Sequence, residues 1–260
     1  MIIVTLITVI FSHAFTSLAE YNPATGEDDF VIVGTAQEVK LGRSLAKNIE
    51  KEFGLTKNAG MQIRVDEIGQ RIAKICDRQD ITYSFKALEG KNLKKEQQYN
   101  AFALPGGYVY IFKTMVEDMK SDDELAAILA HEVGHIAAKH SVKKLQNSIG
   151  MAGLNLIGAV TGADRRERVM ASSAITYLMM DYSREAEFQA DKLGVIYMKK
   201  AGFNPKAAVT CMDRMLERQL KRKIGRYRYF RTHPYTSERK AALNKEIEGK
   251  IAFDDYINSA

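Results

Sequence analysis

Two stretches in the first third of the chain carry apolar residues three or four positions apart among charged residues. The first covers residues 36–55 and the second covers residues 61–78. This spacing places the apolar side chains on one face of a helix, so we expect two amphipathic helices, of which the first ends near Gly54. The apolar positions are Val39, Leu41, Leu45 and Ile49 in the first stretch, and Ile63, Val65, Ile68, Ile72 and Ile75 in the second.

Three shorter stretches that follow have the patterns of strands. Residues 81–88 alternate between apolar and polar side chains, whereas residues 100–104 and 108–112 are mostly apolar. The Pro-Gly-Gly triplet at residues 105–107 separates the last two stretches, and such a triplet is typical of a turn. We therefore expect a small sheet, built as a hairpin or a meander and flanked by helices.

A more apolar helix is expected to begin after Ser121. Ser121 and Glu124 have the spacing of a capping box, and two more acidic residues lie in the first turn, where the helix dipole favours them. Further helices are expected within residues 166–202 and 237–249. The pattern as a whole predicts an α+β, mostly helical fold with a central helix packed beside the small sheet.

Residues 148–162 are glycine-rich and apolar, with Asn155 as an interruption. The segment is shorter than the ~20 residues that a membrane-spanning helix needs. We expect a mobile or tucked loop with partial helix that packs against the core. The sequence leaves open whether this segment also acts as a lid over a cleft.

The first 19 residues resemble a secretory signal peptide. An apolar run to about Ile10 is followed by a mixed segment and by small residues up to Ala19, near which we expect the cut. No lysine or arginine precedes Lys40, which departs from the usual basic start. The run is too short for a membrane span, so we expect an exported protein of the periplasm or cell envelope, soluble or peripherally membrane-associated, with residues 20–260 as a single domain.

Composition and charge narrow this picture only slightly. The 260 residues are 46% hydrophobic and 27% charged, which is enough for a core in one domain. The net charge of +6 is compatible with an anionic membrane surface, nucleic acid or acidic substrates. Residues 221–234 are basic with interleaved aromatic side chains, but in an exported protein we expect a solvated or membrane-facing surface here and no nucleic-acid binding.

The two cysteines leave their pairing open. Cys76 and Cys211 would both meet an oxidising compartment in an exported protein, so a disulfide between them is one interpretation. Two separately buried thiols are the other, because a sequence does not show whether two Cα atoms lie within bonding reach.

The central helix carries the candidate chemistry. His131 and His135 are four residues apart and therefore project from one face of a helix, where both imidazoles can bind one tetrahedral metal ion. Glu132 lies beside the first histidine, off this face, from where it can take a proton from a metal-bound water. The competing interpretation is a core helix whose two histidines are hydrogen-bonded elsewhere.

A catalytic zinc site needs a third protein ligand and an open position for water. His140 follows His135 by five residues, which turns it away from the ligand face of one continuous helix. A metzincin arrangement needs a glycine and a histidine where this chain has Ala138 and Ser141. A glutamate soon after the motif is also missing, so a ligand from a later helix remains.

Residues 183–191 can supply that ligand. Glu187 and Asp191 lie four residues apart on one helical face, with the small Ala190 beside them allowing close approach of another helix. We expect Glu187 to be the third ligand and Asp191 to accept a hydrogen bond from a ligand histidine. Glu185 is the rival ligand, and a solvated face of paired charges is the competing interpretation of all three acids.

Three motifs together resemble a known family. "NAFALPGG", "HEVGH" and "SREAEFQAD" are similar to those of the gluzincin metallopeptidases of the HtpX, Oma1 and CAAX prenyl protease type, metallopeptidase family forty-eight, and most of all to its small periplasmic BepA- and LoiP-like members. The resemblance covers about residues 37–239. It implies a gluzincin-type zincin fold, one metallopeptidase domain, and one zinc ion bound by His131, His135 and Glu187, with Glu132 as the base.

The resemblance implies two further features. The strand at 108–112 would offer its edge to an extended substrate. His233, in "RTHP", would lie near the metal, either stabilising the oxyanion or closing the site as a fourth ligand. An exposed loop histidine is the competing interpretation of His233.

These observations predict a zinc-dependent endopeptidase that cleaves unfolded or misassembled exported proteins, in protein quality control. The alternative is a chaperone-like protein whose cleft holds unfolded chains with little or no turnover. Glu132 favours the enzyme, since a protein that only holds its clients has no need of a base.

Overall fold

The computed structural model describes residues 19–91, 93–147, 173–178, 180–221 and 227–248. The first 18 residues of the predicted signal peptide and the glycine-rich segment 148–162 lie outside the described residues. The helices are α2 (Thr35–Phe53), α3 (Ala59–Ala73), α4 (Lys113–Asp118), α5 (Asp122–Ala137), α8 (Arg184–Lys200), α9 (Lys206–Lys221), α10 (Arg228–Thr232) and α11 (Ser237–Glu248), with a 3-10 turn η1 (Pro105–Gly107). The strands are β1 (Ala19–Asn22), β2 (Glu27–Phe30), β3 (Ser84–Leu88), β4 (Ala101–Leu104) and β5 (Tyr108–Phe112).

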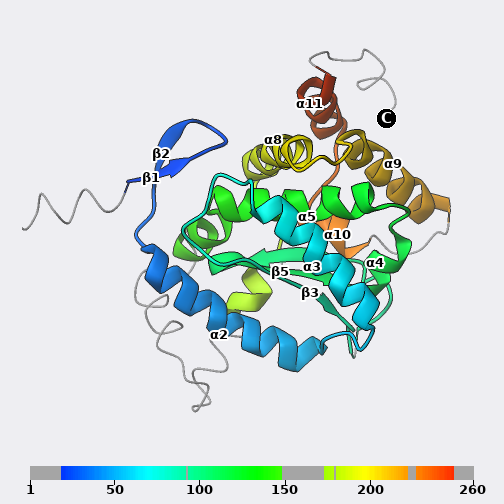
Figure 1. The fold of residues 1–260 in the computed structure, drawn as a ribbon, viewed down its shortest axis with the longest axis horizontal. Coiled ribbons are helices and arrows are strands. Elements are labelled where there is room, and N and C mark those ends of the chain that lie inside the picture. Colours follow the sequence, from blue (N-terminus) through cyan, green and yellow to red (C-terminus); the bar gives the residue numbers. More distant parts are fainter. Residues whose placement is uncertain (1–18, 92, 148–172, 179, 222–226, 249–260) are drawn as a thin grey trace, which may run out of the picture.

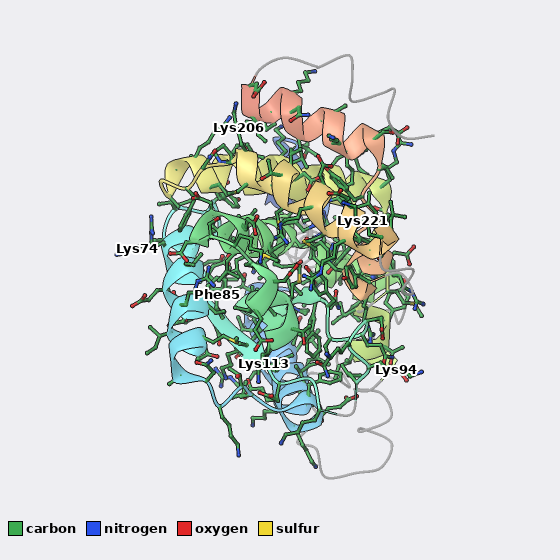
Figure 2. The ribbon with its side chains drawn as sticks, turned by 90° about the vertical axis from the view of Figure 1, so that its right-hand side faces the viewer. Lys74, Phe85, Lys94, Lys113, Lys206 and Lys221 are labelled. Carbon is green, nitrogen blue, oxygen red and sulfur yellow. The ribbon has the colours of Figure 1, made fainter. Side chains whose placement is uncertain are left out.

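The described elements confirm the predicted fold class, mostly helical with a small sheet beside the central helix (Figure 1). In that view the layers run from α11 at the top through α8 and α9, then α5, then the sheet, to α2 at the bottom. Figure 2 shows the same layers from the side, with Lys74 and Lys94 at opposite edges of the molecule. The motif-bearing helix α5 therefore lies in the middle of the molecule.

The three-stranded sheet corrects one expectation. Its order is β3-β5-β4, with β5 parallel to β3 and antiparallel to β4. The hairpin of β4 and β5 is as predicted, with Gly106 and Gly107 at positive φ in its turn. A meander is wrong, because β4 does not pair with β3, the strand before it, and β5 lies between the two. The strand at 108–112 is therefore central and has no free edge, so the expected substrate edge there is also wrong.

Both faces of this sheet are buried, and the alternation of side chains divides them. Apart from Phe85, the side chains that face α3 and α5 are alanine, valine and isoleucine, whereas leucine and aromatic side chains face α2. On the first face lie Phe85, Ala87, Ala101, Ala103, Val109 and Ile111, and on the second Leu88, Phe102, Leu104, Tyr110 and Phe112. The two alanines of β4 let α5 lie close to the strand, which brings the motif helix and this edge strand together.

Helices α5 and α8 approach each other at two glycines. A methyl group at Gly134 of α5 would lie 2.8 Å from the carbonyl oxygen of Ala190 in α8. A methyl group at Gly194 would lie 3.3 Å from the backbone nitrogen of His131. The two backbones are therefore in near contact, and this contact sets the distance between the side chains that the helices present to each other.

The segment before α2 forms a structure that the sequence did not predict. Strands β1 and β2 pair antiparallel as a separate hairpin, with Asn22 opposite Glu27. Its polar side docks on the end of α5 and on α8. Lys139 forms an ion pair with Glu20, Lys143 forms one with Asp29, and Lys192 donates a hydrogen bond to the carbonyl oxygen of Ala24.

Two questions left open by the sequence can be answered for the described ranges. Cys76 and Cys211 are both buried and unpaired. Burial raises the pKa of both thiols, and it raises that of Cys211 to about 12. None of the helices in these ranges combines the length and apolar character that a bilayer crossing requires.

Candidate metal centre and active site

Helix α5 is fixed in place before its motif begins. The Ser121 hydroxyl accepts a hydrogen bond from the Glu124 amide at 3.2 Å, which confirms the predicted cap. The Glu124 carboxylate accepts from the Lys120 amide at 2.7 Å. Every residue from Glu124 to the end of α5 is buried, so the two histidines and Glu132 face a packed interior.

The two motif histidines point one ring nitrogen at each other. The Nε2 atoms of His131 and His135 lie 3.1 Å apart. Each Nδ1 atom is occupied, at 2.9 Å from Asp191 Oδ1 for His131 and at 2.8 Å from His140 Nδ1 for His135. If each Nδ1 carries the proton, two Nε2 lone pairs converge in a buried site, which is an arrangement that a shared cation stabilises.

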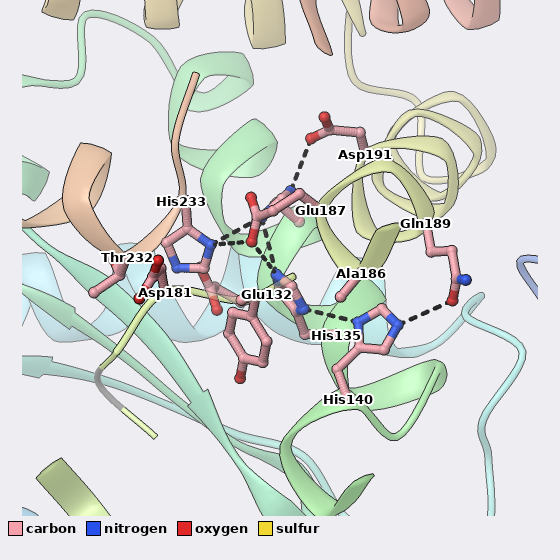
Figure 3. Close-up of polar contacts among 12 residues, drawn as sticks. Glu132, His135, His140, Asp181, Ala186, Glu187, Gln189, Asp191, Thr232 and His233 are labelled. Carbon is pink, nitrogen blue, oxygen red and sulfur yellow. Dashed lines mark hydrogen bonds and ion pairs between the residues drawn. The ribbon is translucent and has the colours of Figure 1, made fainter. Parts of the chain in front are cut away.

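Glu187 and His233 complete this group (Figure 3). The Glu187 carboxylate lies 3.3 Å from His135 Nε2 and 3.4 Å from His131 Nε2. His233 Nδ1 lies 2.9 Å from Glu187 and 3.3 Å from His131 Nε2. One donor atom from each of the four residues falls within 4.8 Å of the others, and all four residues are buried. The nitrogen-rich donor set with one carboxylate fits a metal ion of the zinc type.

Local structure explains how Glu187 reaches the histidines. Ser183 caps the start of helix α8, since its hydroxyl accepts a hydrogen bond from the Ala186 amide at 3.2 Å. Glu187 therefore lies in the first helical turn, beside α5. The rival ligand Glu185 is exposed and accepts a hydrogen bond from Gln189. The structure therefore brings Glu187 into the group and leaves Glu185 outside it.

The charges of the site call for a cation between them. Burial alone would lower the pKa of His131, but Glu187 and Asp191 outweigh it and raise that pKa to about 10. The pKa of Glu187 is held well below its usual value, because Arg239, His233 and His131 outweigh the effect of burial. Two ionised carboxylates thus face the histidines, and a positive charge there is favourable whether a proton or a metal supplies it.

Glu132 lies beside this group and is fully buried. No described side chain donates a hydrogen bond to either oxygen of its carboxylate. Burial raises its pKa, and the ring of His233 lies beside it, with Nε2 3.5 Å from Glu132 Oε1. A buried carboxylate with a raised pKa is a stronger proton acceptor than an exposed one, as the role of base requires.

Three residues that the sequence did not single out for the site contact it. Arg239 lies at 2.6 Å from Glu187 and at 2.8 Å from both oxygens of Asp191. The ring of Tyr182 stacks on His135 with centroids 4.0 Å apart. His140 is no member of the four-residue group, but α5 ends at Ala137, and the turn beyond it carries the ring back to His135. We expected His140 to point away from the ligand face, and that expectation assumed one continuous helix, whereas α5 ends before His140.

Comparison with known proteins places the chain in a family. The model of peptidase family M48 matches residues 61–247, well over half of the chain. The chain belongs to peptidase family M48. The match confirms the family and the enzyme class, a metalloendopeptidase, that the motifs predicted.

Curated relatives include fungal and bacterial proteins. The mitochondrial metalloendopeptidase OMA1 of Schizosaccharomyces pombe is 28% identical over 232 residues, which cover 87% of this chain and 66% of the relative. OMA1 of Saccharomyces cerevisiae is also 28% identical, over 86% of this chain and 67% of the relative. The beta-barrel assembly-enhancing protease of Escherichia coli is 21% identical over 78% of this chain, and the match spans 42% of that protein.

Proposed function

We propose that this M48 peptidase is a zinc-dependent endopeptidase that cleaves unfolded or misassembled proteins of the cell envelope. The supporting observation is the convergence of His131, His135 and Glu187 beside the buried carboxylate of Glu132, to which no described side chain donates a hydrogen bond. Two imidazoles and one carboxylate are the ligand set of many catalytic zinc sites, in which a fourth position is left for water. Zinc, when bound, lowers the pKa of its water to about 7 and polarises the scissile carbonyl.

The residues of the chain then have distinct tasks. Glu132 takes the proton from the attacking water and returns it to the leaving amine. Asp191 accepts from Nδ1 of His131 and so keeps its Nε2 directed at the metal, and Arg239 holds the carboxylates of Asp191 and Glu187. These groups are buried in the folded protein, which limits the water around them and strengthens the electrostatic interactions among them.

Strand β4 is the proposed binding edge for the substrate. It is an edge strand of the sheet and packs against α5, whereas β5 is enclosed between two neighbours. An extended peptide that pairs with β4 would pass close to the motif of α5. Binding through backbone hydrogen bonds requires an extended chain, which favours unfolded segments over folded domains as substrates.

Cleavage of an unfolded protein is the direct test. We expect the purified protein to cleave casein, which is largely unfolded, and to leave a stable folded protein such as native ubiquitin intact. A chelator should stop the cleavage, and zinc should restore it. A protein that binds casein, holds its zinc and never cleaves it would support the chaperone-like alternative instead.

His233 has two proposed roles that one variant separates. Its Nδ1 lies among the metal ligands and its Nε2 lies near Glu132, so it can close the metal site at rest and donate a hydrogen bond to the oxyanion during turnover. We expect His233→Ala to keep one zinc per chain, because three ligands remain, and to lose about 100-fold in kcat on casein. Zinc analysis and steady-state kinetics measure both. A rise in kcat would leave His233 only the closing role.

Export to the envelope is supported by the N-terminal pattern. The relatives' names point in two directions, since the fungal proteins are called mitochondrial and the Escherichia coli protein is named for beta-barrel assembly. The proposal rests on residues 1–19. Sequencing the N-terminus of the protein recovered from an envelope fraction tests it, with a start near Glu20 expected and an intact Met1 contradicting a cleaved signal peptide.

A further inference from the structure

A chain of hydrogen bonds leads from His135 away from the metal site. His135 Nδ1 lies 2.8 Å from His140 Nδ1, and His140 Nε2 lies 3.0 Å from Gln189 Oε1 (Figure 3). The same Gln189 oxygen lies 3.0 Å from Nδ2 of Asn22 in strand β1. Four side chains from three separate segments thus connect the second ligand histidine to the N-terminal hairpin β1–β2.

The donors and acceptors of this chain allow one consistent direction. Nδ2 of Asn22 can only donate, so Gln189 Oε1 accepts from it. Gln189 Oε1 also accepts from His140, which places the His140 proton on Nε2 and leaves its Nδ1 as an acceptor. His135 must then donate from Nδ1, and its Nε2 lone pair is free for the metal. The outer residues therefore select the tautomer of His135 that binds an ion.

His140 does not belong to α5 but begins the next helical stretch, residues 140–147, and its ring is also supported from outside that stretch by Gln189. Helix α5 ends at Ala137, and Lys139 has a positive φ of 52° just before His140. The outermost residue of this chain, Asn22, is itself buried and held in place. Asn22 is only 2% exposed, and its Nδ2 also donates to Asp29 at 2.8 Å, across the hairpin. Lys139 lies just before His140 and Lys143 lies in the same helical stretch as His140, so their ion pairs hold the hairpin against the segment that carries this ring.

We propose that the hairpin β1–β2 is part of the metal centre, and that Asn22 is a positioning residue for the ligand His135, acting through Gln189 and His140. This inference rests on the proposed metal site. The hairpin would then help to retain the metal through Gln189 and His140, without itself contacting a metal ligand. The predicted cut near Ala19 leaves Asn22 in the mature chain, so processing at that position preserves the connection.

The rate at which zinc leaves the protein tests the inference. A coloured chelator in excess reports this rate for the full-length protein, without any substrate. Loss of an outer hydrogen-bond partner of a metal ligand commonly costs about 10-fold to 100-fold in metal affinity. We expect zinc loss to be about 10-fold faster in Gln189→Met and roughly threefold to 10-fold faster in Asn22→Ala. The visible absorption of the Co²⁺-substituted protein should change in the same two variants.

Two control variants separate positioning from general loosening of the hairpin. Glu20→Gln removes the ion pair with Lys139, two residues from Asn22 in the same strand, and should keep the wild-type rate of zinc loss. The double variant Glu185→Gln with Gln189→Glu exchanges donor and acceptor between these two residues and retains an accepting oxygen at position 189. This exchange should return the rate of zinc loss to near that of the wild type.

The outcomes distinguish the inference from the proposed function. Equal rates of zinc loss from the wild type and Asn22→Ala overturn the inference while leaving the metal site in place. The same holds if Glu20→Gln speeds zinc loss as much as Asn22→Ala does, since the hairpin would then act only through its docking. A metal-replete wild type that holds no zinc overturns the proposed function, and the inference with it.

Discussion

Replacing Glu132 by glutamine is expected to reduce the cleavage of casein by about 10³-fold, because general acid–base catalysis contributes roughly 10²-fold to 10⁴-fold. Glutamine has nearly the same shape but no basic oxygen. The Glu132 carboxylate receives no hydrogen bond from a described side chain, so the substitution leaves no partner unsatisfied there. Its pKa is raised by burial, which suits it to take a proton that a less buried carboxylate would accept less readily.

The measurement must separate loss of the base from loss of the metal. We expect Glu132→Gln to hold one zinc per chain, as the wild type should, while kcat falls. Glu185→Gln is the matched control, since it changes an exposed glutamate close to the site in sequence and should keep both zinc and kcat. Casein cleavage at the wild-type rate by Glu132→Gln would exclude Glu132 as the base.

Replacing Glu187 by alanine is expected to remove most of the zinc. The carboxylate lies within 3.4 Å of the Nε2 atoms of both motif histidines, and its loss removes the only carboxylate of the four-residue group and leaves three imidazoles with no anionic ligand. We expect the zinc affinity to fall more than 100-fold, beyond the range found for residues that only support a ligand. Casein cleavage should fall with it.

Zinc per chain after dialysis measures this effect, with thermal unfolding of the metal-free proteins as the check on folding. Glu187 also faces Arg239, so the alanine variant leaves that guanidinium to Asp191 alone. Glu187→Gln fills the same volume, and it should lose zinc affinity as well. If both variants keep a full zinc ion, the third ligand is another residue and the proposed site is wrong.

The helices and the core of the site could be predicted because their signals are local. The Ser121 cap and the shared face of His131 and His135 follow from local sequence signals, whereas the contact of Asp191 with His131 also needs α8 to pack on α5. The contest between Glu185 and Glu187 could not be decided by periodicity alone. Which of the two joins the buried group depends on which side of α8 faces α5, and that orientation comes from packing between helices distant in sequence.

Other features depend on contacts that a linear pattern does not contain. Strand β5 has the composition of any buried strand, and nothing in it tells a central strand from an edge strand. The hairpin β1–β2 has an almost wholly polar second strand and reads as a loop, because its inner side docks through ion pairs instead of apolar side chains. His140 was misplaced for a simpler reason, since the end of α5 was not predicted to fall before it.

The close approach of α5 and α8 at Gly134 and Gly194 also bears on whether the fold depends on the metal. Small zinc domains often fold only when the ion gathers their ligands. Here the ligands lie on two helices whose backbones touch through Gly134 and Gly194, and an extensive apolar core surrounds them. Shape complementarity between α5 and α8 brings the donor atoms together, so we expect the fold to persist when the metal is removed and to take up zinc again without refolding.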